Sequence, residues 1–347
     1  MRVLVTGSCG YVGSRLVPKL LADGHEVVGY DMQWFGDGFL PNGNRSLRMV
    51  CADIRNIETF KNALDHVDAV VHLACVSNDT SCGLDEKLST SINYDAFEPL
   101  VIAAKESGVR RFIFCSSSSV YGSSNADNVT EDHPLIPLTL YNKYKGLCEP
   151  LLFKHQSPDF TCVVIRPATV CGPAPRMRFD LTVNVLTMNA VKKGIITVYG
   201  GDQKRPNLHI DDMCDVYRLL LAAPSEKIAG QTFNVGIQNM KVIDIAKLVQ
   251  DTVSKRGFPK PSIEVREHTD DRSYHINSNK IAEVLGFTAK RTVEQAIWQM
   301  CMDFQSGKWK DALSTDWYYA RRPGELQCIR NEFGPTWLMN FKLSSIL

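Results

Sequence analysis

The sequence lacks the features that mark membrane, secreted or nucleic-acid-binding proteins. No apolar run approaches the length of a membrane span, and residues 3–6 form a strand pattern where a secretory signal would have its apolar segment. The 39 Lys and Arg residues nearly balance the 38 Asp and Glu residues, so the net charge is only +1. This balance indicates neither a nucleic-acid partner nor a membrane-surface partner.

Cysteine is frequent but follows no pattern. The 11 cysteines are scattered, odd in number and without a Cys-x-x-Cys pair. This distribution favours free thiols in a reducing cytoplasm over a disulfide framework or a zinc site. We therefore expect a cytoplasmic protein without a bound metal. The 347 residues contain no internal repeat or low-complexity segment and suffice for one large or two modest domains.

A glycine-rich turn near the N-terminus is the first positive signal. An apolar strand pattern at residues 1–6 is followed by Gly7, Gly10 and Gly13, and residues 11–22 form a helix pattern. Gly7 permits a tight turn, Gly10 lets the backbone approach a phosphate, and Gly13 lets the helix pack on the strand. A strand, a glycine turn and a helix N-terminus together form a binding site for a pyrophosphate.

The second strand pattern, residues 26–30, ends in Asp31. A carboxylate about 20 residues after the glycines suits the two hydroxyls of an adenosine ribose. Its charge would repel a 2′-phosphate. The sequence therefore predicts NAD, rather than NADP, as the cofactor.

The pair Tyr141 and Lys145 is the second signal. A spacing of four residues on a helix places both side chains on one face. Because an ammonium beside a phenol favours the phenolate, we expect Lys145 to lower the pKa of Tyr141. A tyrosine tuned in this way can take a proton from a sugar or alcohol hydroxyl near neutral pH. Together with the distant glycine turn, the pair indicates an oxidoreductase.

Strand and helix patterns alternate through the first half of the chain. The strand patterns cover residues 3–6, 26–30, 47–53, 69–74, 111–116 and 161–166. Such alternation predicts an α/β fold with a Rossmann-type, doubly wound parallel sheet. After residue 173 the pattern breaks into smaller pieces, which indicates a smaller α/β domain interleaved with the first.

We expect three parts of the chain. The NAD-binding Rossmann domain covers residues 1–173, with return elements near residues 206–238. The substrate domain covers residues 174–205 and 239–320, and a C-terminal tail covers residues 321–347.

Six short motifs carry a resemblance to a known family. They are Thr6-Gly7-x-x-Gly10-x-x-Gly13, Asp53-Ile54, His72-Leu73-Ala74, residues 116–122 (SSSSVYG), Tyr141-x-x-x-Lys145 and residues 166–173 (RPATVCGP). In this order they resemble the extended short-chain dehydrogenase/reductases, specifically the NAD-dependent nucleotide-sugar epimerases and dehydratases. The resemblance covers roughly residues 1–290. It implies an enzyme of polysaccharide biosynthesis that uses NAD, acts on a nucleoside-diphosphate sugar and forms a homodimer.

The resemblance also assigns roles to residues. Tyr141 would be the acid/base, Lys145 would bond the nicotinamide ribose, and Ser117 would orient the reacting sugar oxygen. The implied cofactor-binding residues are Gly7, Gly10, Tyr11, Val12, Gly13, Asp31, Asp53, Ile54, Leu73, Ala74, Tyr141, Lys145 and Pro167, with the Asp53 carboxylate accepting from the adenine amino group. The implied substrate-binding residues are Asn78, Ser118, Ser119, Thr169, Arg178, Asn184, Arg205 and Arg272.

Some of these substrate residues leave alternatives open. Asn184, Arg205 and Arg272 match positions near the diphosphate, where an arginine fork can bond two oxygens. Arg176 and Arg178 fall in the same region, and either substrate contact or exposure to solvent is consistent with their place. The Asn78 side chain either bonds sugar hydroxyls or belongs to a turn without substrate contact.

The residues after Ser117 discriminate between reactions. In the family, 4,6-dehydratases carry Asp-Glu at the positions of Ser118 and Ser119, and epimerases with a cysteine base carry it at Ser119. Serine hydroxyls are too weakly acidic to replace either. What remains is hydride exchange with a sugar carbon, most simply C4. Thr169 stands where many 4-epimerases carry Asn, which speaks against a UDP-galactose 4-epimerase specifically.

Three functions are compatible with the sequence. The first is an epimerase that oxidises C4 transiently and returns the hydride to the other face of the sugar. The second is a C4 dehydrogenase or ketoreductase, which would use the same residues but release its product. The third is a non-catalytic NAD-binding sensor, which the Tyr141 and Lys145 pair opposes.

Overall fold

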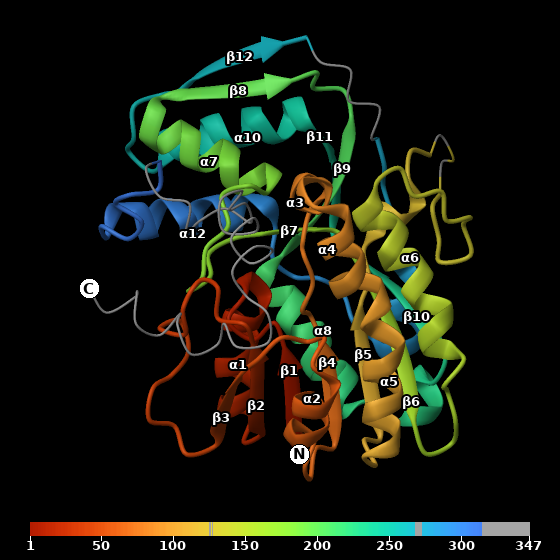
Figure 1. Cartoon of the computed structure of the whole chain (residues 1–347). Helices are drawn as coiled ribbons and strands as arrows, with labels where there is room; N and C mark the ends of the chain where they lie inside the picture. Colours follow the sequence, from red (N-terminus) through yellow and green to blue (C-terminus); the bar gives the residue numbers. More distant parts are fainter. Residues whose placement is uncertain (125, 127, 268–272, 314–347) are drawn as a thin grey trace.

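A seven-stranded, all-parallel sheet forms the centre of the molecule (Figure 1). The computed structural model describes residues 1–313 except 125, 127 and 268–272. The strands follow the order β10-β6-β5-β4-β1-β2-β3. They are β1 (Arg2–Thr6), β2 (Glu26–Asp31), β3 (Leu47–Cys51), β4 (Ala69–His72), β5 (Arg111–Cys115), β6 (Thr161–Pro167) and β10 (Gln231–Val235). The predicted Rossmann-type α/β fold is confirmed.

The central strands are buried on both faces because consecutive residues are apolar. In β1, Val3 and Val5 join the core on one face of the sheet, whereas Leu4 joins the core on the other face. All three side chains are fully buried. A parallel sheet of this kind needs a layer of helices on each side.

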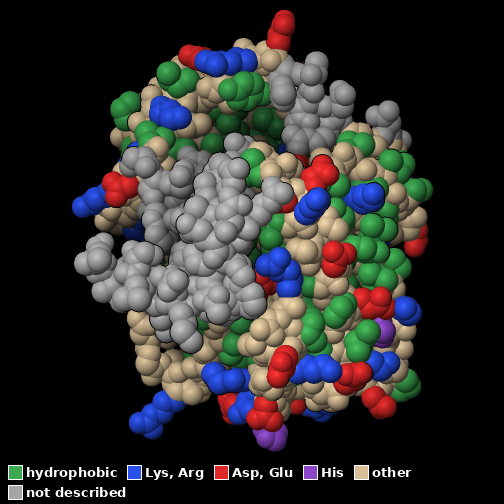
Figure 2. Space-filling view, viewed as in Figure 1, with side chains coloured by type: hydrophobic (Ala, Val, Ile, Leu, Met, Phe, Trp, Pro, Cys, Tyr) green, Lys and Arg blue, Asp and Glu red, His purple; other side chains and the backbone are tan. Residues whose placement is uncertain are grey.

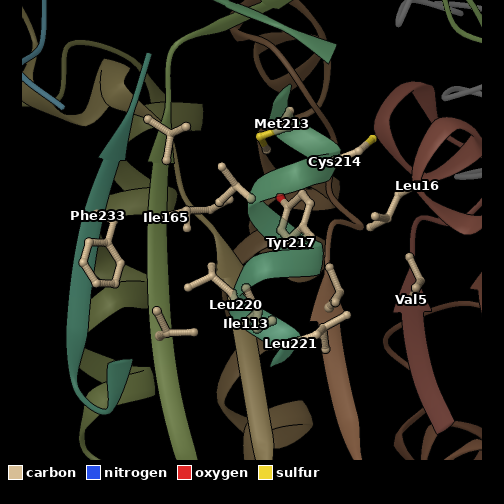
Figure 3. Packing of buried hydrophobic residues seen from close by; sticks show 14 of the residues in the cluster. Val5, Leu16, Ile113, Ile165, Met213, Cys214, Tyr217, Leu220, Leu221 and Phe233 are labelled. Carbon is tan, nitrogen blue, oxygen red and sulfur yellow. The ribbon is translucent and has the colours of Figure 1, made fainter. Parts of the chain in front are cut away.

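Helices cover both faces of the large sheet. On one face lie α1 (Tyr11–Ala22) and α8 (Ile210–Ala222); on the other lie α2 (Ile57–Ala63), α5 (Phe97–Glu106) and α6 (Leu140–Phe153). Figure 3 shows Tyr217 and Leu220 of α8 in front of the sheet, in one apolar cluster with Ile113 of β5 and Ile165 of β6. The strands of the sheet run between these two layers, and the site lies at the carboxyl ends of the strands.

A smaller part of the molecule lies above one end of the large sheet in Figure 1. Its strands are β7 (Thr169–Cys171), β9 (Lys204–His209) and β11 (Gln238–Lys241) in one sheet, and β8 (Ile195–Tyr199) and β12 (Ser262–Arg266) in another. Its main helices are α7 (Thr182–Lys193), α10 (Val242–Lys255) and α12 (Val293–Gln305). Between β9 and β11 the chain returns to the large sheet through α8 and β10.

Several short elements connect these layers. They are α3 (Asp79–Leu84), α4 (Glu86–Thr90), a π-helical turn (Ser91–Asp95), a 3₁₀ helix (Ser118–Tyr121), α9 (Ser225–Ile228) and α11 (Asn279–Leu285). The tail expected over residues 321–347 lies outside the described residues. None of the helices in the described part of the chain has the length and apolar character needed to cross a bilayer.

Candidate active site

A cavity of about 420 Å³ opens where the parallel strands end. Its wall includes the segments that directly follow β1, β3, β4, β5 and β6, together with the end of β2. In open parallel sheets, the carboxyl ends of the strands are where ligands bind. All 13 predicted cofactor residues line this cavity, as do Ser117 and the predicted substrate residues Asn78, Ser118, Ser119, Thr169 and Arg178.

The glycine turn after β1 has no space for side chains. Gly7 has φ +70°, and a Cβ atom there would lie 2.9 Å from the backbone nitrogen of Ala74. A Cβ atom on Gly13 would lie 2.2 Å from the carbonyl oxygen of Gly7. Gly10 precedes α1, and no side chain of the described residues caps that helix. The first N–H groups of α1 therefore face the cavity, as binding of a pyrophosphate requires.

Asp31 ends β2 at the edge of the same cavity. Its carboxylate accepts hydrogen bonds from the backbone N–H of Cys9 (3.0 Å) and of Gln33 (2.7 Å). Burial raises the pKa of Asp31, while these two hydrogen bonds and the nearby Arg176 oppose the rise. The bonds fix the carboxylate at the place where the ribose of an adenine dinucleotide is expected.

Asp53 and Ile54 line the cavity after β3. The Asp53 carboxylate is paired with Arg55, whose Nη2 lies 2.5 Å from Oδ2. It also accepts the backbone N–H of Arg55 at 2.8 Å. The carboxylate therefore has a partner within the protein in addition to the adenine contact expected for it.

Tyr141 and Lys145 lie in the first half of α6. Thr139 begins this helix by accepting the backbone N–H of Asn142, and its hydroxyl donates to Asp79 at 2.6 Å. Lys145 is only 5% exposed, and its Nζ donates to the carbonyl oxygen of Cys115 at 2.6 Å. The same Nζ lies 5.8 Å from the centre of the Tyr141 ring. The ammonium is thus anchored to the end of β5.

The pKa of Tyr141 shifts upward in the structure. Burial raises the pKa of Tyr141 well above its ordinary value, and neighbouring cysteines raise it further. The opposing contribution comes from the guanidinium of Arg178. Desolvation outweighs the attraction of the charges because the phenol lies deep in the protein.

Three serines at the end of β5 line the cavity beside Tyr141. The hydroxyl oxygen of Ser117 lies 2.7 Å from that of Ser119, and Ser119 in turn donates to the side-chain oxygen of Asn142. Ser118 is 2% exposed. This chain of hydroxyls connects the position expected for the reacting sugar oxygen to the helix that carries Tyr141.

A network of side chains closes the same end of the cavity. Arg178 forms two hydrogen bonds with Asp180, at 2.9 and 2.8 Å, and one with Ser77 at 3.2 Å. Asn78 donates to Asp180 at 2.8 Å and caps α3 by accepting the N–H of Ser81. The Arg178 side chain is 12% exposed, so exposure to solvent does not describe it. Asn78 both forms a turn and borders the cavity.

The comparisons with known proteins agree with this geometry. Residues 3–236 match the model of the NAD dependent epimerase/dehydratase family. The chain belongs to this family. A UDP-glucose 4-epimerase of Mycolicibacterium smegmatis is 32% identical over 307 residues, covering 86% of this chain and 96% of the relative.

Solved structures of similar proteins extend the comparison. MoeE5, solved in complex with UDP-glucuronic acid and NAD, superposes with a TM-score of 0.77 and is 26% identical, covering 88% of this chain and all of MoeE5. The dTDP-glucose 4,6-dehydratase DesIV of Streptomyces venezuelae has a TM-score of 0.80 over 90% of this chain and 99% of its own, at 24% identity, and supports the fold. Both the predicted family and its cofactor, NAD, are confirmed, and the residues described above fit that cofactor.

Two predicted substrate residues of this family member lie away from the cavity wall. Asn184 is fully buried; it accepts the N–H of Gly172 at 3.0 Å and donates to the hydroxyl of Tyr11 and the carbonyl of Arg178. Arg205 is 8% exposed and packs its guanidinium 5.4 Å from the ring centre of Tyr274, which does line the cavity. Arg272 lies outside the described residues.

Sequence reasoning missed several residues of the cavity wall. Trp34, Phe35, Cys75 and Tyr274 line it without belonging to a motif. Arg176, for which exposure to solvent was an open alternative, is 2% exposed and also lines it. Its place in an Arg-x-Arg run after the last glycine of the 166–173 motif was the available signal. Within the described residues, no group of His, Cys, Asp or Glu has the arrangement of a metal site.

Proposed function

We propose that the chain is an NAD-dependent nucleotide-sugar epimerase that oxidises and re-reduces C4 of its substrate. The observation that carries this proposal is one continuous cavity. It joins the glycine turn and Asp31 at one end to Tyr141, Lys145 and Ser117 at the other. The M. smegmatis relative, 32% identical over nearly its whole length, is a UDP-glucose 4-epimerase.

The chemistry at Tyr141 is a reversible proton transfer. Tyr141 as phenolate takes the proton of the C4 hydroxyl while the C4–H bond breaks, and it returns the proton after the keto sugar has turned. When bound, NAD accepts the C4 hydride and gives it back. Ser117 orients the reacting oxygen, and the Ser119 and Asn142 hydrogen bonds keep Ser117 in place.

Forming the phenolate needs positive charge near Tyr141. Arg178 supplies one charge, since it is the neighbour that lowers the pKa of this phenol. Lys145 supplies a second charge, on the face of α6 that also carries Tyr141. Burial lowers the pKa of Lys145, but nearby cysteines raise it by more. An oxidised nicotinamide held by these residues would supply a third positive charge.

The surroundings of Ser117 favour epimerisation over dehydration. Ser118 and Ser119 supply hydroxyls where a 4,6-dehydratase needs carboxyl groups. Asp79 also lines the cavity, but its carboxylate accepts the Thr139 hydroxyl at the start of α6. Glu131 is directed elsewhere and accepts the backbone N–H of Asn234.

An isotope experiment tests the proposal. Purified protein is incubated in D₂O separately with each member of a panel of nucleotide sugars, UDP-glucose and UDP-galactose among them, and the products are followed by NMR. We expect one nucleotide sugar of the panel to be converted to its C4 epimer with no deuterium at C5. A 6-deoxy-4-keto product or label at C5 would show dehydratase chemistry instead, and Asp79→Asn would then test the remaining carboxylate.

The same incubation separates the epimerase from a C4 dehydrogenase or ketoreductase. An epimerase recycles its cofactor, so absorbance at 340 nm should not grow with turnover. A dehydrogenase would form NADH in proportion to product.

We further propose that the protein is a cytoplasmic homodimer. Each subunit would contain the two interleaved domains given above. None of its ten described cysteines forms a disulfide, which suits a reducing compartment. Ile102 of α5 and Leu147 of α6 are 37% and 40% exposed on helices that pack against each other. Figure 2 shows hydrophobic side chains over the region that α5 and α6 occupy in Figure 1. Sedimentation of the wild type and of an Ile102→Glu/Leu147→Glu variant tests the dimer, because the charged variant should sediment as a monomer.

A further inference from the structure

Arg176 lines the cavity, but it belongs to none of the family motifs and has no role in the proposed reaction. It lies between β7 and α7, in the smaller part of the molecule, and is 2% exposed. Its backbone N–H donates to the hydroxyl of Ser14 at 3.2 Å. Ser14 is in the first turn of α1, the helix whose N-terminus faces the expected cofactor pyrophosphate. Arg176 therefore lies against the cofactor end of the cavity.

The guanidinium of Arg176 lies over an aromatic ring. Its central carbon is 3.8 Å from the centre of the Phe35 ring, and Phe35 belongs to the loop after β2. A guanidinium at this distance is attracted to the face of the ring. The contact joins the segment after β7 to the loop that follows Asp31, and it fixes the place of the guanidinium.

The neighbouring charges show which part of a dinucleotide the guanidinium would meet. Arg176 acts on Asp31, since its charge is among the influences that lower the pKa of that carboxylate. Among the described wall residues, the other basic side chains are Arg178, paired with Asp180, and Lys145, bonded to the Cys115 carbonyl. Both of those lie near Tyr141. Arg176 thus brings positive charge to the region between the ribose carboxylate and the start of α1.

We propose that Arg176 binds the diphosphate of the cofactor and that Phe35 positions its guanidinium for this contact. The inference rests on the NAD site of the proposed function but does not depend on the reaction at C4. The start of α1 offers backbone N–H groups and a partial positive charge of about half an elementary charge. A diphosphate carries two negative charges, and a guanidinium fork would add charge-assisted hydrogen bonds to those of the backbone N–H groups.

Binding of cofactor fragments tests the proposal without turnover. Dissociation constants of NAD, ADP-ribose and adenosine are measured by calorimetry for the wild type and for Arg176→Met. Loss of one charge-assisted partner should weaken NAD and ADP-ribose more than tenfold. Adenosine, which has no diphosphate, should bind the variant within twofold of the wild type. Arg176→Lys, which keeps the charge but not the fork, should give an intermediate loss for ADP-ribose.

Two further variants complete the design. Phe35→Leu should weaken ADP-ribose about two- to tenfold, because it removes only the cation–π contact. Arg266→Met is the control. Arg266 lies in β12, far from the motif segments, and its side chain is 59% exposed. This variant should leave every dissociation constant unchanged. If Arg176→Met does not fold, Arg176→Lys and the salt dependence of ADP-ribose binding to the wild type decide the question.

Several outcomes would overturn the proposal. Equal losses for adenosine and ADP-ribose would mean that Arg176 shapes the ribose pocket instead. Unchanged ADP-ribose binding together with weakened UDP binding would assign Arg176 to the substrate diphosphate. Unchanged binding of all ligands would remove it from the site. A wild type that binds no NAD at all would contradict the proposed function itself, which keeps the two failures distinguishable.

Discussion

The buried ion pair between Glu149 and Arg166 allows a quantitative prediction about the free energy of unfolding. Nη2 of Arg166 lies 2.6 Å from Oε2 of Glu149, and the two side chains are 7% and 4% exposed. Ser116 also donates its hydroxyl to Glu149 at 2.6 Å. Removing one partner leaves a buried charge without its counterion, which typically costs about 3–5 kcal/mol. We expect Glu149→Met and Arg166→Met each to lower the free energy of unfolding by that amount.

The double variant should lose much less than the two single variants together. It removes both charges at once, and replacing a buried pair by apolar side chains is often close to neutral. The Ser116 hydroxyl and the carbonyl of Glu131, which accepts from Arg166 at 2.9 Å, would each lose a partner. Unpaired buried groups cost roughly 1–3 kcal/mol each, so we expect a loss of about 2–6 kcal/mol for the double variant, below the roughly 6–10 kcal/mol that the two single losses would give if they added.

Urea unfolding followed by circular dichroism measures all three variants. The matched control is the pair Arg2 and Glu26, which lie 2.7 Å apart but are 34% and 58% exposed. Its coupling free energy should stay below about 1 kcal/mol, as for exposed pairs in general. Losses that simply add for Glu149→Met and Arg166→Met, as they would at unconnected sites, would refute the reasoning.

Three predictions concern the site itself. Tyr141→Phe should lower kcat on the order of 10²–10⁴-fold and leave the Kd of NAD nearly unchanged, because only the proton acceptor is lost; near-normal turnover would remove Tyr141 from the mechanism. NAD should bind more tightly than NADP, since Asp31 would repel a 2′-phosphate, and Asp31→Asn should narrow the difference measured by calorimetry. Arg178→Met should move the rise of kcat with pH to higher pH, because this cation lowers the pKa of Tyr141; an unshifted profile would contradict its electrostatic role.

Local sequence rules predicted the parts of the site that depend on the backbone. Gly7 and Gly13 stand where the structure has no room for a Cβ atom, and Asp31 ends its strand at the cavity as expected. The motifs also predicted that Ser117, Tyr141 and Lys145 belong to one site, and in the structure all three line the cavity. These features follow from the periodicity of strands and helices and from turn chemistry, both of which are visible along the chain.

Properties that depend on neighbours distant in the sequence could not be predicted in this way. The pKa of Tyr141 is raised by burial and by Cys75 and Cys115, and it is lowered by Arg178, 37 positions later in the chain. The side-chain amide of Asn184 is of a kind that often binds ligands, yet it forms hydrogen bonds with the backbone N–H of Gly172 and the hydroxyl of Tyr11. Which polar side chain is used internally and which faces the cavity is decided by packing across the whole fold.

The position of β10 in the large sheet has a consequence for biosynthesis. This strand pairs with β6, but the chain between them first builds several elements of the smaller part, including α7, β8 and β9. At roughly 5–20 residues per second of translation, the edge of β6 stays open for several seconds after β6 has left the ribosome. An unpaired edge is a template for association with other chains. A nascent chain whose β10 is still inside the ribosome should therefore depend on chaperones more strongly than one whose β10 has emerged.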